Sequence, residues 1–306
     1  MRRVLVAAAI TACAGTAVFS GETAAPSGGL RYTITVSRFE NRANWSGSWN
    51  LGDAWGTVLT DMLNQSGRFI VLGESDMRNE ALAEQDFAAS GRVAGGAKAP
   101  ATGQMTPAQL LVKGAITHVQ MDTGGKGGGL RIKGFRIGGR GQKAEINATI
   151  YVVDSTTGQV IASTNVVGKA EKKGIKLGFD TSRWGAAFGG HENDNLGLAV
   201  QDACAKAVQF IIDQLPNVAW TGTVAAVRGD KVYVNRGQRE GVRPGMEFVV
   251  GQRDVIRDPD TGEILDEEVI EVARLRVDRV KEKVSICSVV SGDAAKVTKG
   301  MAVHLP

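Results

Sequence analysis

The sequence predicts an α+β protein in which a mixed-sheet domain with two extended β-hairpins is followed by a small all-β barrel. Amphipathic helical segments alternate with strand-like segments as far as Pro216, and from Trp220 onward short strands follow one another between glycine turns. The count of 40 glycines against 7 prolines is typical of many strands and tight turns. We expect a signal peptide over residues 1–24, the α+β domain over 25–218 and an SH3-like barrel over 219–306.

The amino terminus is typical of an export signal. Arg2 and Arg3 precede an uncharged apolar run over residues 4–19, which is shorter than the about 20 residues of a membrane-spanning helix. Cys13 follows an aliphatic and two small residues, so it is a candidate for lipid attachment. Cleavage of an ordinary signal peptide near Ser20 is the alternative. Both interpretations predict export to the cell envelope.

The remaining composition argues against several classes of function. A net charge of +4 is too small to indicate nucleic-acid binding on its own. Three histidines without a Cys-x-x-Cys pair predict no metal site, and no nucleophile lies in a recognisable catalytic motif. We therefore expect no catalytic residue, no metal, no cofactor and no nucleic-acid partner. Cys204 and Cys287 fall in different predicted domains, which favours two buried free thiols over a disulfide.

The first elements are predicted from periodicity and capping residues. Alternation of apolar and polar residues predicts a strand, whereas apolar residues at three- and four-residue spacing predict a helix. A serine or threonine before such a segment, or a proline in its first turn, predicts a helix start. The predicted elements are strands at 32–39, 69–72 and 114–121, and helices from Leu51 to Gly67, from a cap at Ser75 to about Glu84, and from Thr106 and Pro107 onward.

The later elements follow from the same patterns. Residues 258–263 are rich in carboxylates, but they lack the spacing of a calcium-binding loop and predict a turn between strands. The predicted elements are hairpins at 124–153 and 160–190, a helix from Leu196 to Leu215, and barrel strands at 221–227, 231–235, 247–250, 269–280 and 284–290.

The hairpin at 124–153 carries the most informative pattern. Six positive charges occur before the first acid, Glu145, and a bulge at Gly134 would separate basic from apolar side chains. Strands of about 9–11 alternating residues form transmembrane barrels, but a soluble half-buried hairpin has the same period. The basic face would hold Arg131, Lys133 and Arg136, and the membrane-facing candidates are Leu130, Ile132, Phe135 and Ile137.

The second hairpin is less typical of a membrane element. Residues 169–176 carry four lysines and a glutamate, so both faces are charged. A lysine on a lipid-facing surface costs ~2–4 kcal/mol near the bilayer midplane. These side chains must therefore face a lumen, lie at an interface or remain outside the membrane.

Four segments occur in an order that identifies a family resemblance. They are LGDAWGTVLTDMLNQSGRFIVLGESD (51–76), GQMTPAQLLVKGAITHV (103–119), GGGLRIKGFRIGG (127–139) and VVDSTTGQVIAS (152–163). Together they resemble the CsgG family of curli-secretion proteins. The resemblance covers about residues 30–215, and its specificity lies in the ordered set rather than in any one segment.

This resemblance implies a ring-shaped oligomeric pore in the outer membrane. Each subunit of such a ring contributes two β-hairpins to a shared barrel and keeps an α+β domain in the periplasm. Such proteins are anchored as lipoproteins and export unfolded amyloid subunits. By position, 127–153 and 162–190 would be the membrane hairpins, and loop 41–50 would line the constriction. The constriction candidates are Asn44, Trp45, Trp49 and Asn50, although the two tryptophans could instead pack beneath the ring.

Three features depart from the family pattern. The lipid-attachment motif at Cys13 lies early in the apolar run, the second hairpin is highly charged, and the C-terminal barrel has no counterpart in the curli pore. Residues 221–306 resemble the C-terminal domain of flagellar assembly protein T through the turns GVRPG and DPDTGE.

Two functions therefore stay open. The first is an oligomeric outer-membrane secretion channel that passes unfolded protein subunits and works with periplasmic accessory proteins. The alternative is a soluble periplasmic assembly or activator protein, like flagellar-ring components or activators of peptidoglycan synthases. The length and alternation of 124–153 favour the channel, and the charge in 169–176 favours the alternative.

Overall fold

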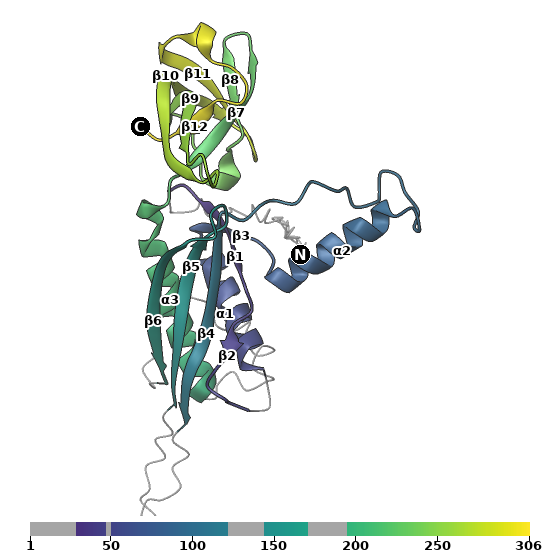
Figure 1. Cartoon of the computed structure of the whole chain (residues 1–306), viewed down its shortest axis with the longest axis vertical. Coiled ribbons are helices and arrows are strands. Elements are labelled where there is room, and N and C mark those ends of the chain that lie inside the picture. Colours follow the sequence, from purple (N-terminus) through teal and green to yellow (C-terminus); the bar gives the residue numbers. More distant parts are fainter. Residues whose placement is uncertain (1–28, 47–49, 122–143, 171–194) are drawn as a thin grey trace, which may run out of the picture.

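The computed structural model describes residues 29–46, 50–121, 144–170 and 195–306, and it contains a mixed-sheet α+β domain followed by a closed β-barrel (Figure 1). The predicted fold class is therefore confirmed. The α+β sheet has the strand order β3-β1-β4-β5-β6, with β2 paired to β4. Its strands are β1 (Tyr32–Val36), β2 (Glu40–Asn41), β3 (Phe69–Val71), β4 (Leu110–Met121), β5 (Ala144–Asp154) and β6 (Val160–Lys169).

The direction of the strands divides this sheet into two parts. β1, β2 and β3 run parallel to the neighbours they pair with, whereas β4, β5 and β6 form an antiparallel meander. All five residues of β1 are buried, as expected of a strand between parallel neighbours. β5 is the central strand of this meander, and its alternate residues from Ala144 to Val152 are buried.

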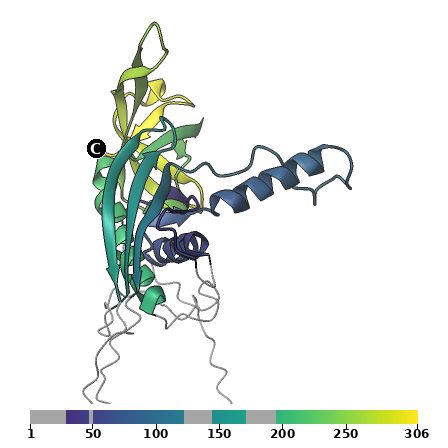
Figure 2. The ribbon, with the colours of Figure 1, turned by 60° about the horizontal axis from the view of Figure 1, so that its bottom comes forward.

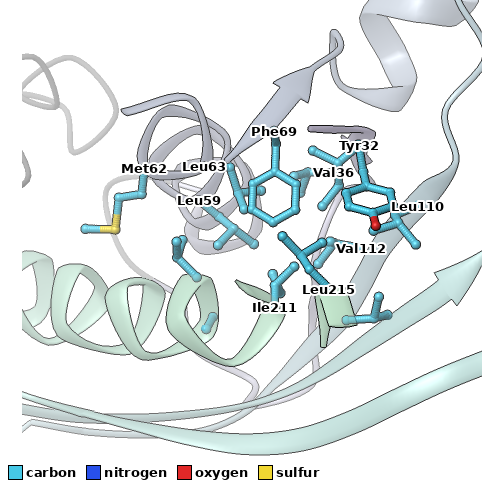
Figure 3. Close-up of a cluster of buried hydrophobic side chains, with 14 of the residues drawn as sticks. Tyr32, Val36, Leu59, Met62, Leu63, Phe69, Leu110, Val112, Ile211 and Leu215 are labelled. Atoms are coloured by element: carbon cyan, nitrogen blue, oxygen red, sulfur yellow. The ribbon is translucent and has the colours of Figure 1, made fainter. Parts of the chain in front are cut away.

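Two helices provide the core of the α+β domain. The apolar stripe of α1 (Leu51–Gln65) meets that of α3 (Asn195–Asp213), and both cover one face of the sheet. In Figure 3, Leu59 and Leu63 of α1 point toward Phe69 and Ile211. Each such buried side chain contributes about 1.5–3 kcal/mol. The first predicted helix is confirmed, and Gly67 follows it with a positive φ of 64°.

The second helix differs from its prediction. α2 (Ser75–Ala89) extends beyond Glu84, has no buried residue and stands away from the rest of the chain (Figure 1). Ser75 is its first helical residue rather than its cap, and its hydroxyl lies 3.1 Å from that of Ser37. The helix is therefore an exposed arm, which apolar periodicity alone does not reveal.

The predicted helix start at Thr106 and Pro107 is wrong. The backbone is extended there, because the Gln109 N–H donates to the backbone carbonyl of Thr33 at 3.0 Å and to its hydroxyl at 2.9 Å. β4 begins at the next residue, so pairing with β1 overrides the local helix signal.

The C-terminal barrel closes in the order β10-β11-β8-β7-β12-β9. Trp220 and Phe248 stack in its core with ring centroids 5.1 Å apart. Closure leaves the barrel itself without an unpaired edge. Its strands are β7 (Thr221–Arg228), β8 (Lys231–Val234), β9 (Glu247–Arg257), β10 (Ile264–Val280), β11 (Ser285–Gly292) and β12 (Ala302–His304).

One hydrogen bond joins the barrel to the residue before β1, and a second joins β1 to the segment that leads into the barrel. The Arg31 N–H donates to the carbonyl of Glu240 at 2.9 Å, and the Tyr32 hydroxyl donates to the carbonyl of Val218 at 2.9 Å. Burial raises the pKa of this tyrosine, so its hydroxyl stays protonated as a donor. The barrel is therefore held by contacts as well as by the chain.

Both described cysteines, Cys204 and Cys287, are buried free thiols, as predicted. Burial raises the pKa of Cys204 well above its ordinary value and that of Cys287 to about 11. The thiols are therefore protonated and unreactive at neutral pH. Cys13 lies outside the described residues.

Candidate functional site at the open end of the sheet

The three strands of the meander all reach the end of the sheet that lies farthest from the barrel, and we call this end of the strands the open edge (Figure 1). Met121 at the end of β4 pairs with Ala144 at the start of β5, and the Ala170 N–H donates to the Ala144 carbonyl at 2.9 Å. Residues 122–143 and 171–194 therefore both connect to the domain at this edge. The expected basic face (Arg131, Lys133, Arg136) and the membrane-facing candidates (Leu130, Ile132, Phe135, Ile137) lie outside the described residues.

The described half of the first expected hairpin belongs to the domain core. Residues 144–153 form most of β5, whose alternate side chains are fully or almost fully buried beneath α3. The alternation of apolar and polar residues in β5 is thus explained by packing within the domain. Residues 160–169 of the second expected hairpin are β6, which pairs with β5 and continues the same sheet. The buried apolar side chains of β5 are Ala144, Ile146, Ala148, Ile150 and Val152.

The end of β6 is held against α3 at the point where residues 171–194 begin. A Cβ added at Gly168 would collide with the Ala199 carbonyl oxygen and lie 2.7 Å from the Ala203 Cβ, so α3 packs directly on the β6 backbone. One residue later, the Lys169 N–H donates to the carboxylate of Asp202 at 2.9 Å. This contact fixes the position at which the chain leaves the sheet.

Asp202 is a buried carboxylate with a charged partner. Its Oδ2 accepts from the Nζ of Lys206 at 2.8 Å, and the same Nζ donates to the Val167 carbonyl at 2.7 Å. A second pair, Lys169 and Glu145 at 3.6 Å, joins β6 to β5 at this edge. Asp202 and Lys206 were not predicted as site residues from the sequence, although an acid and a base four residues apart beside an apolar stripe are a visible signal.

The expected constriction loop begins with a short pairing and a tight turn. The backbone N–H of Arg42 donates to the Ile116 carbonyl at 2.8 Å, which continues the parallel pairing of β2 with β4. The Asn41 side chain donates to the Trp45 carbonyl at 2.7 Å. Between them, Asn44 adopts a φ of 51°, a conformation that asparagine tolerates better than most residues. The loop is therefore shaped by its own backbone and by two asparagines.

The four constriction candidates have different environments. Asn44 is exposed. Trp45 is partly buried and packs against the hydrophobic core, in agreement with the alternative given for the tryptophans. Asn50 caps α1, because its side-chain oxygen accepts from the N–H groups of Gly52 and Asp53 at 3.0 and 3.2 Å. Trp49 lies outside the described residues.

An open pocket of 590 Å³, lined by both polar and apolar surface, lies beside this loop. Ion pairs join Glu40 to Arg42 at 2.7 Å and Arg38 to Asp53 at 2.7 Å. A hydrogen bond from Arg42, strengthened by its charge, holds the pKa of Glu40 below its usual range. The pocket can bind water or small polar groups, and its described lining offers no nucleophile paired with a base. The lining residues are Ser37, Arg38, Phe39, Glu40, Asn41, Asn50, Ser75 and Lys113.

The described ranges contain neither a cluster of metal-binding side chains nor a helix suited to cross a membrane. No group of three or more histidine, cysteine, aspartate or glutamate side chains there is arranged to hold a metal ion. None of the helices in the described part of the chain has the length and hydropathy needed to cross a membrane.

The mixed sheet and its two covering helices define an α+β domain into which two long segments, 122–143 and 171–194, are inserted at one end of the sheet. The sequence profile of the family described as "Curli production assembly/transport component CsgG" matches residues 16–246. This is more than half of the chain, so the protein belongs to the CsgG family. Membership associates the chain with assembly at the outer membrane of the cell envelope.

Comparison with solved structures gives only distant likenesses. Protein CT253 from Chlamydia trachomatis is 13% identical, with 60% of this chain and 96% of that chain covered and a TM-score of 0.36. The PelC dodecamer from Paraburkholderia phytofirmans is 10% identical, with coverages of 58% and 86% and a TM-score of 0.32. The LpoB C-terminal domain from Salmonella enterica is 12% identical, with coverages of 47% and 86% and a TM-score of 0.25. At these scores they support no argument about function. Comparison with curated proteins gave no match.

Proposed function

We propose that the protein is a subunit of an oligomeric outer-membrane secretion channel of the curli-export type. It passes unfolded protein subunits, works with periplasmic accessory proteins, and has neither enzymatic activity nor a cofactor. One observation carries the proposal: residues 122–143 and 171–194 both join the domain at one edge of the sheet. Membership in the CsgG family supports the same function.

The physical argument starts from strand length. A transmembrane strand needs about 9–11 residues, so each of the two segments is long enough for a two-strand hairpin. Four strands cannot close a barrel, because membrane barrels contain at least about 8. Several copies must therefore share one barrel. Arg131, Lys133 and Arg136 would then face a water-filled lumen, since lipid exposure of such charges costs ~2–4 kcal/mol each at the midplane.

Loop 41–50 supports the proposal by its position. β2, at the start of the loop, pairs with Ala115 and Ile116 at the middle of β4, on the barrel-distal side of the pairing of β1 with residues 110–112. In a ring with the open edges toward the membrane, the exposed Asn44 would lie near the entrance of the channel. Asn50 contributes indirectly, because it fixes the start of α1 and hence the end of the loop.

The test is planar-bilayer conductance of the full-length protein extracted in mild detergent. Deletion of residues 127–143 should abolish steady channels while thermal unfolding of the remaining domain is unchanged. Charge reversal at Arg131, Lys133 and Arg136 should keep the channels but change their ion selectivity from anions toward cations. The matched control reverses Arg253 in the barrel and should leave selectivity unchanged. Channels that survive the deletion would refute the proposal.

The second candidate is a periplasmic assembly or activator protein that makes no pore. It is favoured by the burial of the β5 apolar face, because the alternation that suggested a membrane strand there serves the domain core. This candidate predicts a soluble ring or monomer without conductance, with the C-terminal barrel as the surface for partners.

A further inference from the structure

The hairpin of β9 and β10 extends well beyond the rest of the barrel (Figure 2). β12 pairs with β9 only at residues 249–251, and β11 pairs with β10 only from Ala273 onward. Across the described chain, residues 252–257 and 264–270 pair only with each other. We call residues 252–271 the acidic arm. A two-stranded ribbon with two free edges is marginally stable in water, so a partner along it would be stabilising.

Negative charges are grouped on one face of the acidic arm. Asp254 lies directly opposite Glu268 in the antiparallel register, and Asp266 lies opposite Ile256. Like charges in directly opposed positions are destabilising, and this face has no basic residue. The other face is balanced by the ion pair of Arg253 with Glu267 at 3.4 Å. The acidic face therefore lacks the counter-charge that the other face has.

The acidic arm also exposes large apolar side chains. Ile256 is 56% exposed and Ile270 is 54% exposed, and both lie on the acidic face. Leu265, at a bulge near the tip, is 59% exposed. Apolar side chains grouped among charges on a projecting ribbon are typical of a docking surface. The partner should thus offer basic groups beside apolar surface.

The rest of the same barrel has the opposite charge. Residues 252–271 contain eight carboxylates and two arginines, whereas 221–251 and 272–306 contain twelve lysines and arginines and six carboxylates. Part of this excess of positive charge lies at the far end of β10, where Arg279, Lys281 and Lys283 are exposed. Backbone bonds from Gln238 and Arg239 to this turn, at 2.9 and 3.0 Å, bring Arg236 and Arg239 beside it. We call these five basic residues the basic end. Two carboxylates lie at the same end, Glu282, which is exposed, and Glu240, which pairs with Arg239 at 2.7 Å, so the five basic residues there still outnumber the acids.

We propose that the acidic arm of one copy docks on the basic end of a neighbouring copy, giving a head-to-tail contact between barrels. The arm and the basic end lie at opposite ends of one strand, separated by a contour of about 40 Å at about 3.3 Å per residue, so they cannot meet within one chain. A head-to-tail docking of surfaces of opposite charge is a heterologous contact, which forms a ring where the rotation between copies closes and a filament where it does not. The inference goes beyond the proposed channel, because it requires several copies but no membrane pore.

The experiment mixes two full-length cysteine variants, Asp254→Cys and Lys283→Cys, under mild oxidation. The native thiols at 204 and 287 are buried, and the unsubstituted protein measures any background from the remaining cysteine. We expect a disulfide-linked dimer in the mixture and at most one tenth as much with either variant alone. The matched control mixes Asp254→Cys with Lys299→Cys, an exposed lysine outside the basic end, and should give background only.

Charge-reversal variants test whether the contact depends on the opposite charges of the two surfaces. Adding Asp266→Lys and Glu268→Lys to the arm variant should lower the dimer yield about tenfold, and Lys281→Glu in the partner should restore part of it. Equal yields in the test and control mixtures would overturn the proposal, as would efficient dimerisation of Asp254→Cys alone, which would indicate arm-to-arm pairing. The deletion of 127–143 should not affect this cross-link. Loss of cross-linking specificity with intact conductance would therefore refute the docking contact and leave the channel standing.

Discussion

Replacement of Gly168 by alanine tests how tightly α3 is packed at the open end of the sheet. The new Cβ would collide with the Ala199 carbonyl oxygen and lie 2.7 Å from the Ala203 Cβ, whereas ordinary contacts are 3.4–4 Å. α3 must therefore move away from β6 by about 1 Å. Overpacking of this kind costs about 1–3 kcal/mol, and backbone atoms on both sides place this site at the upper limit. Weakening of the hydrogen bond from Lys169 to Asp202 adds about 1 kcal/mol.

The expected loss is therefore about 4 kcal/mol in the free energy of unfolding. For a domain of this size, about 1 kcal/mol corresponds to a fall of about 2–4 °C in Tm, so the variant should melt about 10 °C lower. Differential scanning calorimetry of the full-length protein measures this change. Gly95→Ala is the matched control, because a Cβ there meets nothing within 4 Å, and it should melt like the native protein. A loss below about 1 kcal/mol for Gly168→Ala would refute the direct packing of α3 on β6.

Three further predictions concern other parts of the chain. Asn50→Ala removes the α1 cap and should lower the free energy of unfolding by about 1 kcal/mol in denaturant titration, whereas no loss would exclude the capping role. Burial, with repulsion from Asp76, raises the pKa of Glu74, so native stability falls as pH rises through that pKa. Glu74→Gln should thus melt above the native protein at pH 7 and like it at pH 3, and equal melting at both would contradict the shift. Cys204 and Cys287 should resist a thiol-specific dye at pH 8 until the protein is unfolded, and rapid labelling of the native state would show them exposed.

The fold was predictable where the local pattern and the tertiary structure agree. The apolar stripes of the first and last helices of the α+β domain appear in the sequence because each helix has one buried face. The barrel was predictable from its regular glycine turns. The Thr106–Pro107 segment was mispredicted because Gln109, two residues after Pro107, already bonds to Thr33 in a strand more than seventy residues earlier, which no local window contains.

The site was less predictable than the fold. Alternation in 144–153 identified a strand correctly but could not show what covers its apolar face, since lipid and helix α3 impose the same period. Asn50 was chosen as a constriction residue, and its structural role as a helix cap had an equally visible signal in the following apolar stripe. The acidic arm was missed because the predicted strands stopped at 250 and began again at 269, where the hydrophobic pattern is weakest.

The contact of Arg31 with the barrel has a mechanical consequence. The chain enters the barrel at Trp220. The Glu240 carbonyl of the barrel also accepts a hydrogen bond from Arg31, directly before β1. These two attachments restrict the rotation of the barrel relative to the sheet more than the linker alone would. The barrel is therefore restrained at both the beginning and the end of the α+β domain, and breaking the contact at Arg31 should leave it held by the linker alone.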